Sequence, residues 1–278
     1  SSTVEGMNGS ISISGIAVVG KVVKAAYSRT EDEPEYQWYR GTVKIPGADS
    51  GTYTVTEADK GYVLKVRVTG NKAGFVEKAM KDKVVTAEHA GVWSDTEVSE
   101  PALVAGVYVI ETEAELKWFA SQINGGKTGL NAKLADHIQI SGDKWYPIGS
   151  EAHPFAGTFD GNGKEITFAL KSDGKAYQGL FGYIEGKGTV KKLTVNGTLV
   201  LSGETTTAGI VAGYSEGKVL NCISKGSVQA TKGTQIGGIT GSIGLHGRVE
   251  RCRNEASVSA KERAGGIAGV NSYGDTYY

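Results

Sequence analysis

Tyrosines close to four glycine-rich phrases are the side chains of this sequence best suited to hold a ligand. They are Tyr177, Tyr183, Tyr214 and Tyr273. An exposed aromatic ring offers an apolar face on which a sugar ring can stack. Tyr183 and Tyr214 each follow a phrase closely, so we expect them to align along one edge as a binding strip. The alternative is structural, with the rings packing over gaps left by glycines.

Two arginines supply a second candidate surface. Arg251 and Arg253 lie two positions apart on an expected strand, where alternate side chains share a face. They predict a modest basic stripe that would attract an acidic glycan. The other interpretation is a solvated strand face, because outward positions nearby carry both signs of charge, including Lys191, Lys225 and Glu250.

Residues of catalysis do not cluster. The four histidines are widely spaced and no His-Glu-x-x-His occurs, so the signature of zinc peptidases is absent. The sequence also lacks a phosphate-binding loop. Glu151 and His153 are the best acid–base candidates, although surface loops ordinarily contain such residues. We expect no catalytic residue and no enzyme activity in this segment.

Oxygen-bearing side chains around one turn are candidates for calcium binding, namely Asp160, Asn162, Glu165 and Asp173. They lack the closely repeated Gly-Gly-x-Gly-x-Asp pattern of calcium-loaded β-rolls. A glycine turn with a solvated acid explains the same residues. We therefore expect neither a metal nor a cofactor.

Only two cysteines occur, Cys222 and Cys252, one repeat apart. Aligning the repeats places Leu193 at the same position, which favours three apolar core residues stacked in successive turns. A disulfide between adjacent turns is the alternative.

Composition excludes several classes of partner. Thirty basic and thirty acidic residues cancel, so no overall field favours nucleic acid. No apolar run is long enough to span a bilayer, and we expect no membrane insertion in this segment. Glycine is the outlier, because residues 1–105 hold 11 of the 41 glycines and the remainder of the chain holds the other 30. This shift predicts a domain boundary near residue 105.

The glycine-rich phrases recur at a nearly fixed period. They begin at Gly179, Gly209, Gly238 and Gly266, in steps of 30, 29 and 28 residues. Such a period is typical of stacked-repeat proteins. Three short strands per unit predict a right-handed, three-sided parallel β-helix over 106–278, with corners at small residues. The corner residues are Gly197, Gly226 and Ala256, and the extra residue in the phrase at 209–213 predicts a bulge.

Apolar residues of the repeats should stack from coil to coil. Leu180, Ile210, Ile239 and Ile267 predict one column, and Val190, Val219 and Val249 predict another. Ahead of the repeats, residues 112–124 carry a helical apolar pattern and a capping box, from which we expect a helix that covers the first coil.

The N-terminal third predicts a different fold. Short alternating strands are expected within 11–24, 36–40, 52–56 and 63–68, and turn signals separate them. This pattern indicates an all-β sandwich, in which the large side chain of Trp38 fills the core between the two sheets. We expect this domain over 9–86, followed by a linker over 87–105.

Two resemblances follow from these patterns. Two short motifs resemble those of bacterial immunoglobulin-like modules, namely Tyr36-Gln37-Trp38-Tyr39-Arg40 and Leu64-Lys65-Val66-Arg67-Val68. The Trp-x-Pro-Ile-Gly lead-in at 145–149, the Phe-Asp-Gly-Asn-Gly turn at 159–163 and the phrase at Gly179 resemble GLUG repeats. GLUG repeats occur in Gram-positive surface proteins and in N-terminal regions of IgA-protease-type metallopeptidases.

The resemblances imply a non-catalytic fragment of an extracellular, wall-attached or secreted bacterial protein. We expect a monomeric display stalk or adhesion module that contacts host or microbial glycans or surface proteins. The alternatives are the accessory N-terminal region of a secreted metallopeptidase and a carbohydrate-active β-helix enzyme. Because the last repeat breaks off soon after Gly269, we expect the natural protein to continue beyond Tyr278.

Overall fold

The computed structural model describes residues 6–86, 90–94, 96–172, 176–203, 207–232, 235–272 and the backbone of 275–277. The chain divides into two compact units, Ser1–Ala90 and Gly91–Tyr278. Each unit is described by itself below.

The first unit consists of two antiparallel sheets that share one apolar cluster. Trp38 is fully buried in this cluster, as expected, and Val23 and Val66 contribute from opposite sheets. The four expected strand regions are present. One sheet has the order β1 (Ile11–Ser14), β2 (Val22–Tyr27), β5 (Thr52–Thr54), and the other has the order β4 (Val43–Lys44), β3 (Glu35–Arg40), β6 (Val63–Thr69), β7 (Val76–Lys83).

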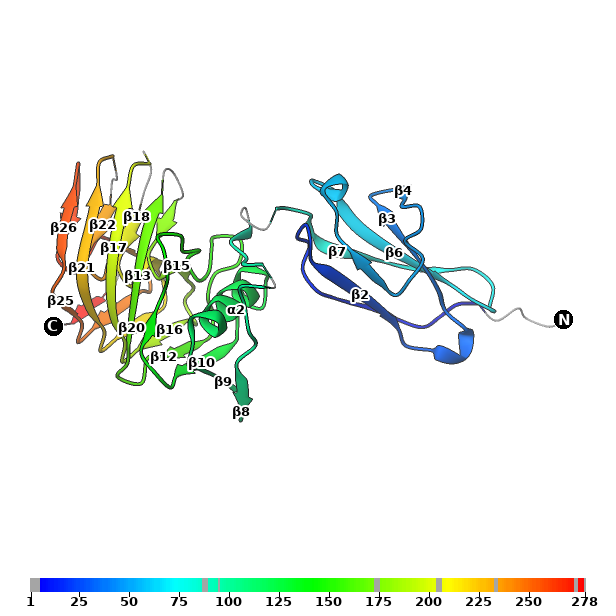
Figure 1. Cartoon of the computed structure of the whole chain (residues 1–278), viewed down its shortest axis with the longest axis horizontal. Helices are drawn as coiled ribbons and strands as arrows, with labels where there is room; N and C mark the ends of the chain where they lie inside the picture. The colour runs from blue at the N-terminus through cyan, green and yellow to red at the C-terminus, as the bar shows by residue number, and fades with distance from the viewer. Residues whose placement is uncertain are drawn as a thin grey trace. The chain divides into compact units, whose positions relative to one another are not determined.

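The second unit is a β-solenoid of about five turns, in which the strands of successive coils lie side by side (Figure 1). Among its described residues the strand pairs are parallel, apart from the antiparallel pair of β8 (Ala102–Val104) with β9 (Val107–Ile110). After β8 and β9, the first sheet continues with β10 (Asn131–Leu134), β12 (Thr158–Asp160), β16 (Thr189–Lys191), β20 (Lys218–Leu220), β24 (Arg248–Glu250) and β29 (Asp275–Tyr277).

The described coils run through four sheets, whereas three strands per repeat were expected, because the glycine-rich phrase forms a corner with a strand on either side. The second sheet contains β11 (Ile138–Gln139), β13 (Glu165–Ser172), β17 (Thr194–Leu201), β21 (Ile223–Ala230), β25 (Arg253–Asn254) and β26 (Ser257–Ala260). The strands before the corner are β14 (Tyr177–Gln178), β18 (Thr207–Gly209), β22 (Gln235–Gly237) and β27 (Ala264–Gly265). The strands after it are β15 (Phe181–Ile184), β19 (Ala212–Ser215), β23 (Thr240–Ile243) and β28 (Ala268–Asn271).

The helix expected ahead of the repeats is α2 (Glu113–Asn124). Thr112 caps it, and the backbone N–H of Glu115 donates to the Thr112 hydroxyl at 3.3 Å. Its apolar face enters the solenoid core through Phe119, whose ring lies 5.8 Å from Phe159 and 6.2 Å from Phe155, centroid to centroid. The helix therefore covers apolar side chains at the first coils. In Figure 1, α2 lies at the end of the solenoid where its first strands are.

Residues expected in the linker join this unit. Trp93 is buried against Tyr146 and Trp145, with ring centroids 4.7 and 6.0 Å away, and β8 pairs with β9. His89 lies outside the described residues.

The corner between the first two sheets is not where the small residues predicted it. Gly197 and Gly226 lie inside β17 and β21, opposite each other. A Cβ on Gly197 would meet Ile210 at 2.9 Å and Phe168 at 3.0 Å, so the glycine leaves room for core side chains. The chain instead turns where one residue per coil adopts the left-handed backbone conformation, with φ of 51–53° at Asn162, Lys192, Asn221 and Arg251.

The glycine-rich phrase also aligns differently from its sequence pattern. Gly209 pairs with Gly237, and Gly237 pairs with Gly265. Relative to the first phrase, the phrase at 209–213 does have one extra residue, but the later coils have the same five-residue form, so the extra residue is not confined to that coil as expected. The N–H groups of Val211 and Ala212 both donate to the Ile239 carbonyl, at 3.0 and 3.1 Å.

This register changes one predicted column and preserves the other. Val211 aligns with Ile239, whereas Ile210 aligns with Gly238, although Ile210 and Ile239 are both fully buried in the same core. The column of Val190, Val219 and Val249 is confirmed, because these residues are direct partners in adjacent strands. The solenoid core is therefore continuous through the coils.

Gly237 tests this close packing. In a Gly237→Ala variant, the new Cβ would overlap the Thr240 carbonyl oxygen and lie 2.8 Å from that of Ile267. Because both are backbone atoms, we expect the free energy of unfolding to fall by about 1–3 kcal/mol. Gly129→Ala is the control, since a Cβ there meets nothing within 4 Å. Chemical denaturation of both variants checks the difference, and equal losses would contradict the assigned register.

Candidate ligand-binding surface

Tyr183 and Tyr214 are direct partners in β15 and β19, which confirms their expected alignment. Their ring centroids are 4.7 Å apart. Strand alternation accounts for this position, because the residues on either side of each tyrosine are buried whereas the tyrosines are half-exposed. Ser242 and Val270 occupy the same column in the next two coils, so the aromatic part ends after Tyr214.

A third ring completes the cluster. Tyr177, from β14, lies 5.4 Å from Tyr183 and 5.5 Å from Tyr214, measured between ring centroids. We call Tyr177, Tyr183 and Tyr214 the tyrosine patch. The sequence placed Tyr177 near a phrase but gave no reason to group it with the other two, because the contact arises across a corner. Tyr273 lies outside the described residues.

The structural interpretation of the tyrosines also holds for one ring. A Cβ on Gly244 would overlap the Tyr214 hydroxyl, so this ring packs closely over a glycine of the next coil. That contact fixes the orientation of Tyr214. A ring held in place by packing loses little conformational freedom when a ligand stacks on it.

Two carboxylates, those of Glu151 and Glu216, act on the tyrosines of the patch. The Tyr214 hydroxyl donates to Glu216 at 3.0 Å, and burial together with this carboxylate raises the pKa of Tyr214. Burial and the charge of Glu151 raise the pKa of Tyr177, and burial and Glu216 raise that of Tyr183. All three hydroxyls therefore remain protonated at neutral pH and can donate or accept a hydrogen bond.

The two arginines lie apart from the patch and are engaged in other contacts. Arg251 is at the left-handed corner after β24, and its Nε donates to Asn221 at 2.9 Å. Arg253, on β25, forms an ion pair with Glu255 at 2.6 Å. The basic stripe is thus partly neutralised.

Lysines on the same sheets are paired in the same way. Lys191 lies 3.3 Å from Asp160, and Lys225 lies 2.9 Å from Glu165. The outer face near the arginines consequently carries alternating charges. The structure brings Tyr183 and Tyr214 together but does not bring them together with Arg251 and Arg253 in one site.

The acid–base and calcium candidates have structural contacts. His153 Nδ1 is 2.6 Å from the carbonyl oxygen of Asn124, which joins its loop to the end of α2. Asn162 donates to the Leu134 carbonyl at 3.1 Å. Asp173 lies outside the described residues, and within the described part of the chain no three His, Cys, Asp or Glu residues are grouped to hold a metal.

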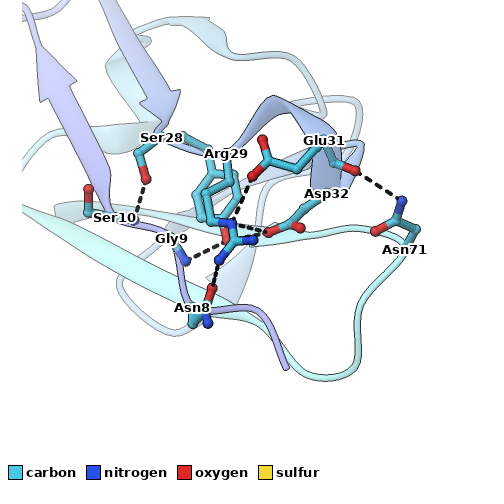
Figure 2. A network of polar contacts seen from close by, with 9 residues as sticks. Asn8, Gly9, Ser10, Ser28, Arg29, Glu31, Asp32 and Asn71 are labelled. Atoms are coloured by element: carbon cyan, nitrogen blue, oxygen red, sulfur yellow. Dashed lines mark hydrogen bonds and ion pairs between the residues drawn. The ribbon is translucent and has the colours of Figure 1, made fainter. Parts of the chain in front are cut away.

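A polar network in the first unit was not predicted (Figure 2). Asp32 is 1% exposed, accepts from the Tyr27 hydroxyl at 3.0 Å and lies 3.6 Å from Arg29 Nε. Arg29 also donates to Asn8 at 2.6 Å and to Glu31 at 3.0 Å. The Arg29 guanidinium supplies the positive charge that balances Glu31 and Asp32. The network therefore has a structural role, because it connects Asn8, near the start of the unit, to η1 (Thr30–Asp32).

Comparison with known proteins yields one informative likeness. Over 120 residues, 41% of this chain, the sequence is 32% identical to a "Putative Gly-rich membrane protein" of Evansella cellulosilytica. The match spans 14% of that relative's length. No family model and no solved structure matches the chain. Among the described residues, no helix has the length and apolar character needed to cross a membrane.

Proposed function

We propose that this chain is a non-catalytic segment of a bacterial cell-surface or secreted protein, and that its tyrosine patch contacts glycans. In this proposal the first unit is an immunoglobulin-like module, and the solenoid is a right-handed GLUG-type stalk that displays the patch. The observation that carries the proposal is the mutual packing of three half-exposed tyrosine rings on one side of the coils. The Gly-rich relative, described as a membrane protein, supports a location at the cell surface.

The charge of the patch favours one class of glycan. Glu151 and Glu216 act on the tyrosine hydroxyls, and their carboxylates would repel uronic or sialic acids. Neutral sugars, and sugars that carry a protonated amine, meet no such repulsion. We therefore propose a neutral or amine-bearing glycan in place of the acidic glycan that Arg251 and Arg253 suggested.

Glycan-array binding followed by titration tests this function. We expect wild-type protein to bind neutral or amine-bearing glycans, and Tyr183→Ala to raise Kd by roughly thirty-fold, equivalent to about 2 kcal/mol for an aromatic hot spot. Tyr62→Ala is the matched control, because Tyr62 is a 52% exposed tyrosine of the first unit. An array without a signal, or equal binding by both variants, would refute the assignment.

Prolonged incubation with the glycans that bind distinguishes an adhesion module from a carbohydrate-active enzyme. If the solenoid only binds, a bound oligosaccharide should keep its length during prolonged incubation. Release of new reducing ends, abolished by replacing an acidic residue near the patch, would instead establish a carbohydrate-active enzyme.

A further inference from the structure

Cys222 and Cys252 face each other across neighbouring coils. Leu220 pairs with Glu250 and Ile223 pairs with Arg253, which leaves the two cysteines opposite one another at the corner. The backbone N–H of Cys222 lies 3.4 Å from Cys252 Sγ. Both thiols are free in this structure.

The spacing suits a covalent bond between the coils. Directly opposed residues of adjacent strands have Cα atoms about 4.8 Å apart. Disulfides form at Cα separations of about 4.4–6.8 Å. The cross-link therefore requires side-chain rotation rather than movement of the two strands.

The two thiols differ in reactivity. Cys222 is fully buried, and its hydrogen bond with the Cys252 thiol and its burial raise its pKa. Cys252 is half-buried, and the hydrogen bond from Cys222 lowers its pKa. The more accessible thiol, with the greater thiolate fraction, reacts first with an external oxidant.

We propose that Cys222 and Cys252 form an oxidisable latch that joins the coil of β20 and β21 to the coil of β24 and β25. The Cys252 thiolate attacks a small-molecule disulfide such as oxidised glutathione, breaks its S–S bond and releases one glutathione thiolate. Cys222 then gives up its proton to solvent and attacks Cys252 Sγ, which releases the second glutathione. Two protein thiols are oxidised, and one glutathione disulfide is reduced to two thiols.

The position of the latch gives it a physical consequence. In the described residues, these two coils are otherwise held by non-covalent contacts, namely strand pairing, packing and side-chain hydrogen bonds such as those of Arg251 with Asn221 and of Ser224 with Asn254. A covalent bond here would oppose separation of the coil of β24 and β25 from the coil of β20 and β21.

The test uses the whole chain with oxidised glutathione at about pH 8, where thiolates form readily. We expect loss of both free thiols, a mass lower by two hydrogens, and a rise in Tm of roughly 5 °C or more, reversed by dithiothreitol. Cys222→Ala should stop at a mixed disulfide on Cys252, and Cys252→Ala should react much more slowly.

Three results would overturn the latch. They are a persistent glutathione adduct on wild-type Cys252, a disulfide-linked dimer, and two thiols that stay free in folded protein while unfolded protein oxidises. The last comparison needs no variant, so a failure of either variant to fold leaves the proposal testable.

Discussion

Phe159→Ala is expected to lower the free energy of unfolding of the solenoid by about 3–5 kcal/mol. Phe159 is fully buried in β12, between the helix and the first complete coils. Its ring centroid lies 5.8 Å from that of Phe119 on α2 and 5.4 Å from that of Phe181 on β15. Removing the ring leaves a cavity between α2 and β15, and a rigid stack of strands cannot readily collapse into it.

Denaturant unfolding followed by circular dichroism measures this loss, which corresponds to a fall in Tm of roughly 10 °C. Val200→Ala is the matched control in the same unit, because Val200 is 41% exposed. A similar small effect of both variants would show that the helix does not depend on this contact.

Asp59→Asn is expected to destabilise the first unit by about 3 kcal/mol. Asp59 is fully buried, and each of its carboxylate oxygens faces donors. Oδ1 accepts from Arg40 Nε at 2.8 Å, and Oδ2 accepts from the Tyr53 hydroxyl at 2.6 Å and from Thr56 at 2.8 Å. An amide must turn its NH₂ group toward one of these donors, which breaks a hydrogen bond and leaves Arg40 without its counter-charge.

The same carboxylate makes stability depend on pH. Burial alone would raise the pKa of Asp59, but hydrogen bonds from Tyr53, Thr56 and Arg40 outweigh burial and hold it below its usual value. The folded unit therefore binds fewer protons than the unfolded chain as pH falls below about 4, the unfolded pKa. Its contribution is complete above that pH and is lost as pH falls through the lower folded pKa. Asp59→Asn should flatten this part of the curve.

Trp38 fluorescence reports on this unit, because Trp38 is its sole tryptophan. Glu31→Gln is the control, since it changes a carboxylate to an amide in a side chain that is 63% exposed and paired with Arg29. We expect that loss to be below about 1 kcal/mol. If the two variants lose equal stability, the buried network around Asp59 has no special role.

Local patterns predicted the elements whose determinants are close together in sequence. The capping box of Thr112 and Glu115 and the apolar face of α2 lie within a few turns, and the helix is present as expected. The repeat period likewise predicted the solenoid and the valine column. Trp38 was recognised from its size and its strand alone.

Features set by contacts between coils were not predictable in the same way. In two of the coils, the corner between the first two sheets falls at Lys192 and Arg251, and neither residue type signals a turn. The position of the corner is set instead by the neighbouring coil, because the backbone of each coil follows that of the coil below it. Gly197 looked like a corner but serves the packing of Ile210 and Phe168. Tyr177 joins the tyrosine patch only through the folding of the phrase between β14 and β15.

The strict pairing of each coil with the next has an evolutionary consequence. Because β17 matches β21 residue for residue over eight positions, the two coils offer interchangeable surfaces to their neighbours. Gain or loss of a whole unit by gene duplication or deletion would leave α2 and every remaining contact type in place. Homologous solenoids should therefore differ in length by multiples of roughly 30 residues, and shorter insertions should be confined to loops outside the paired strands.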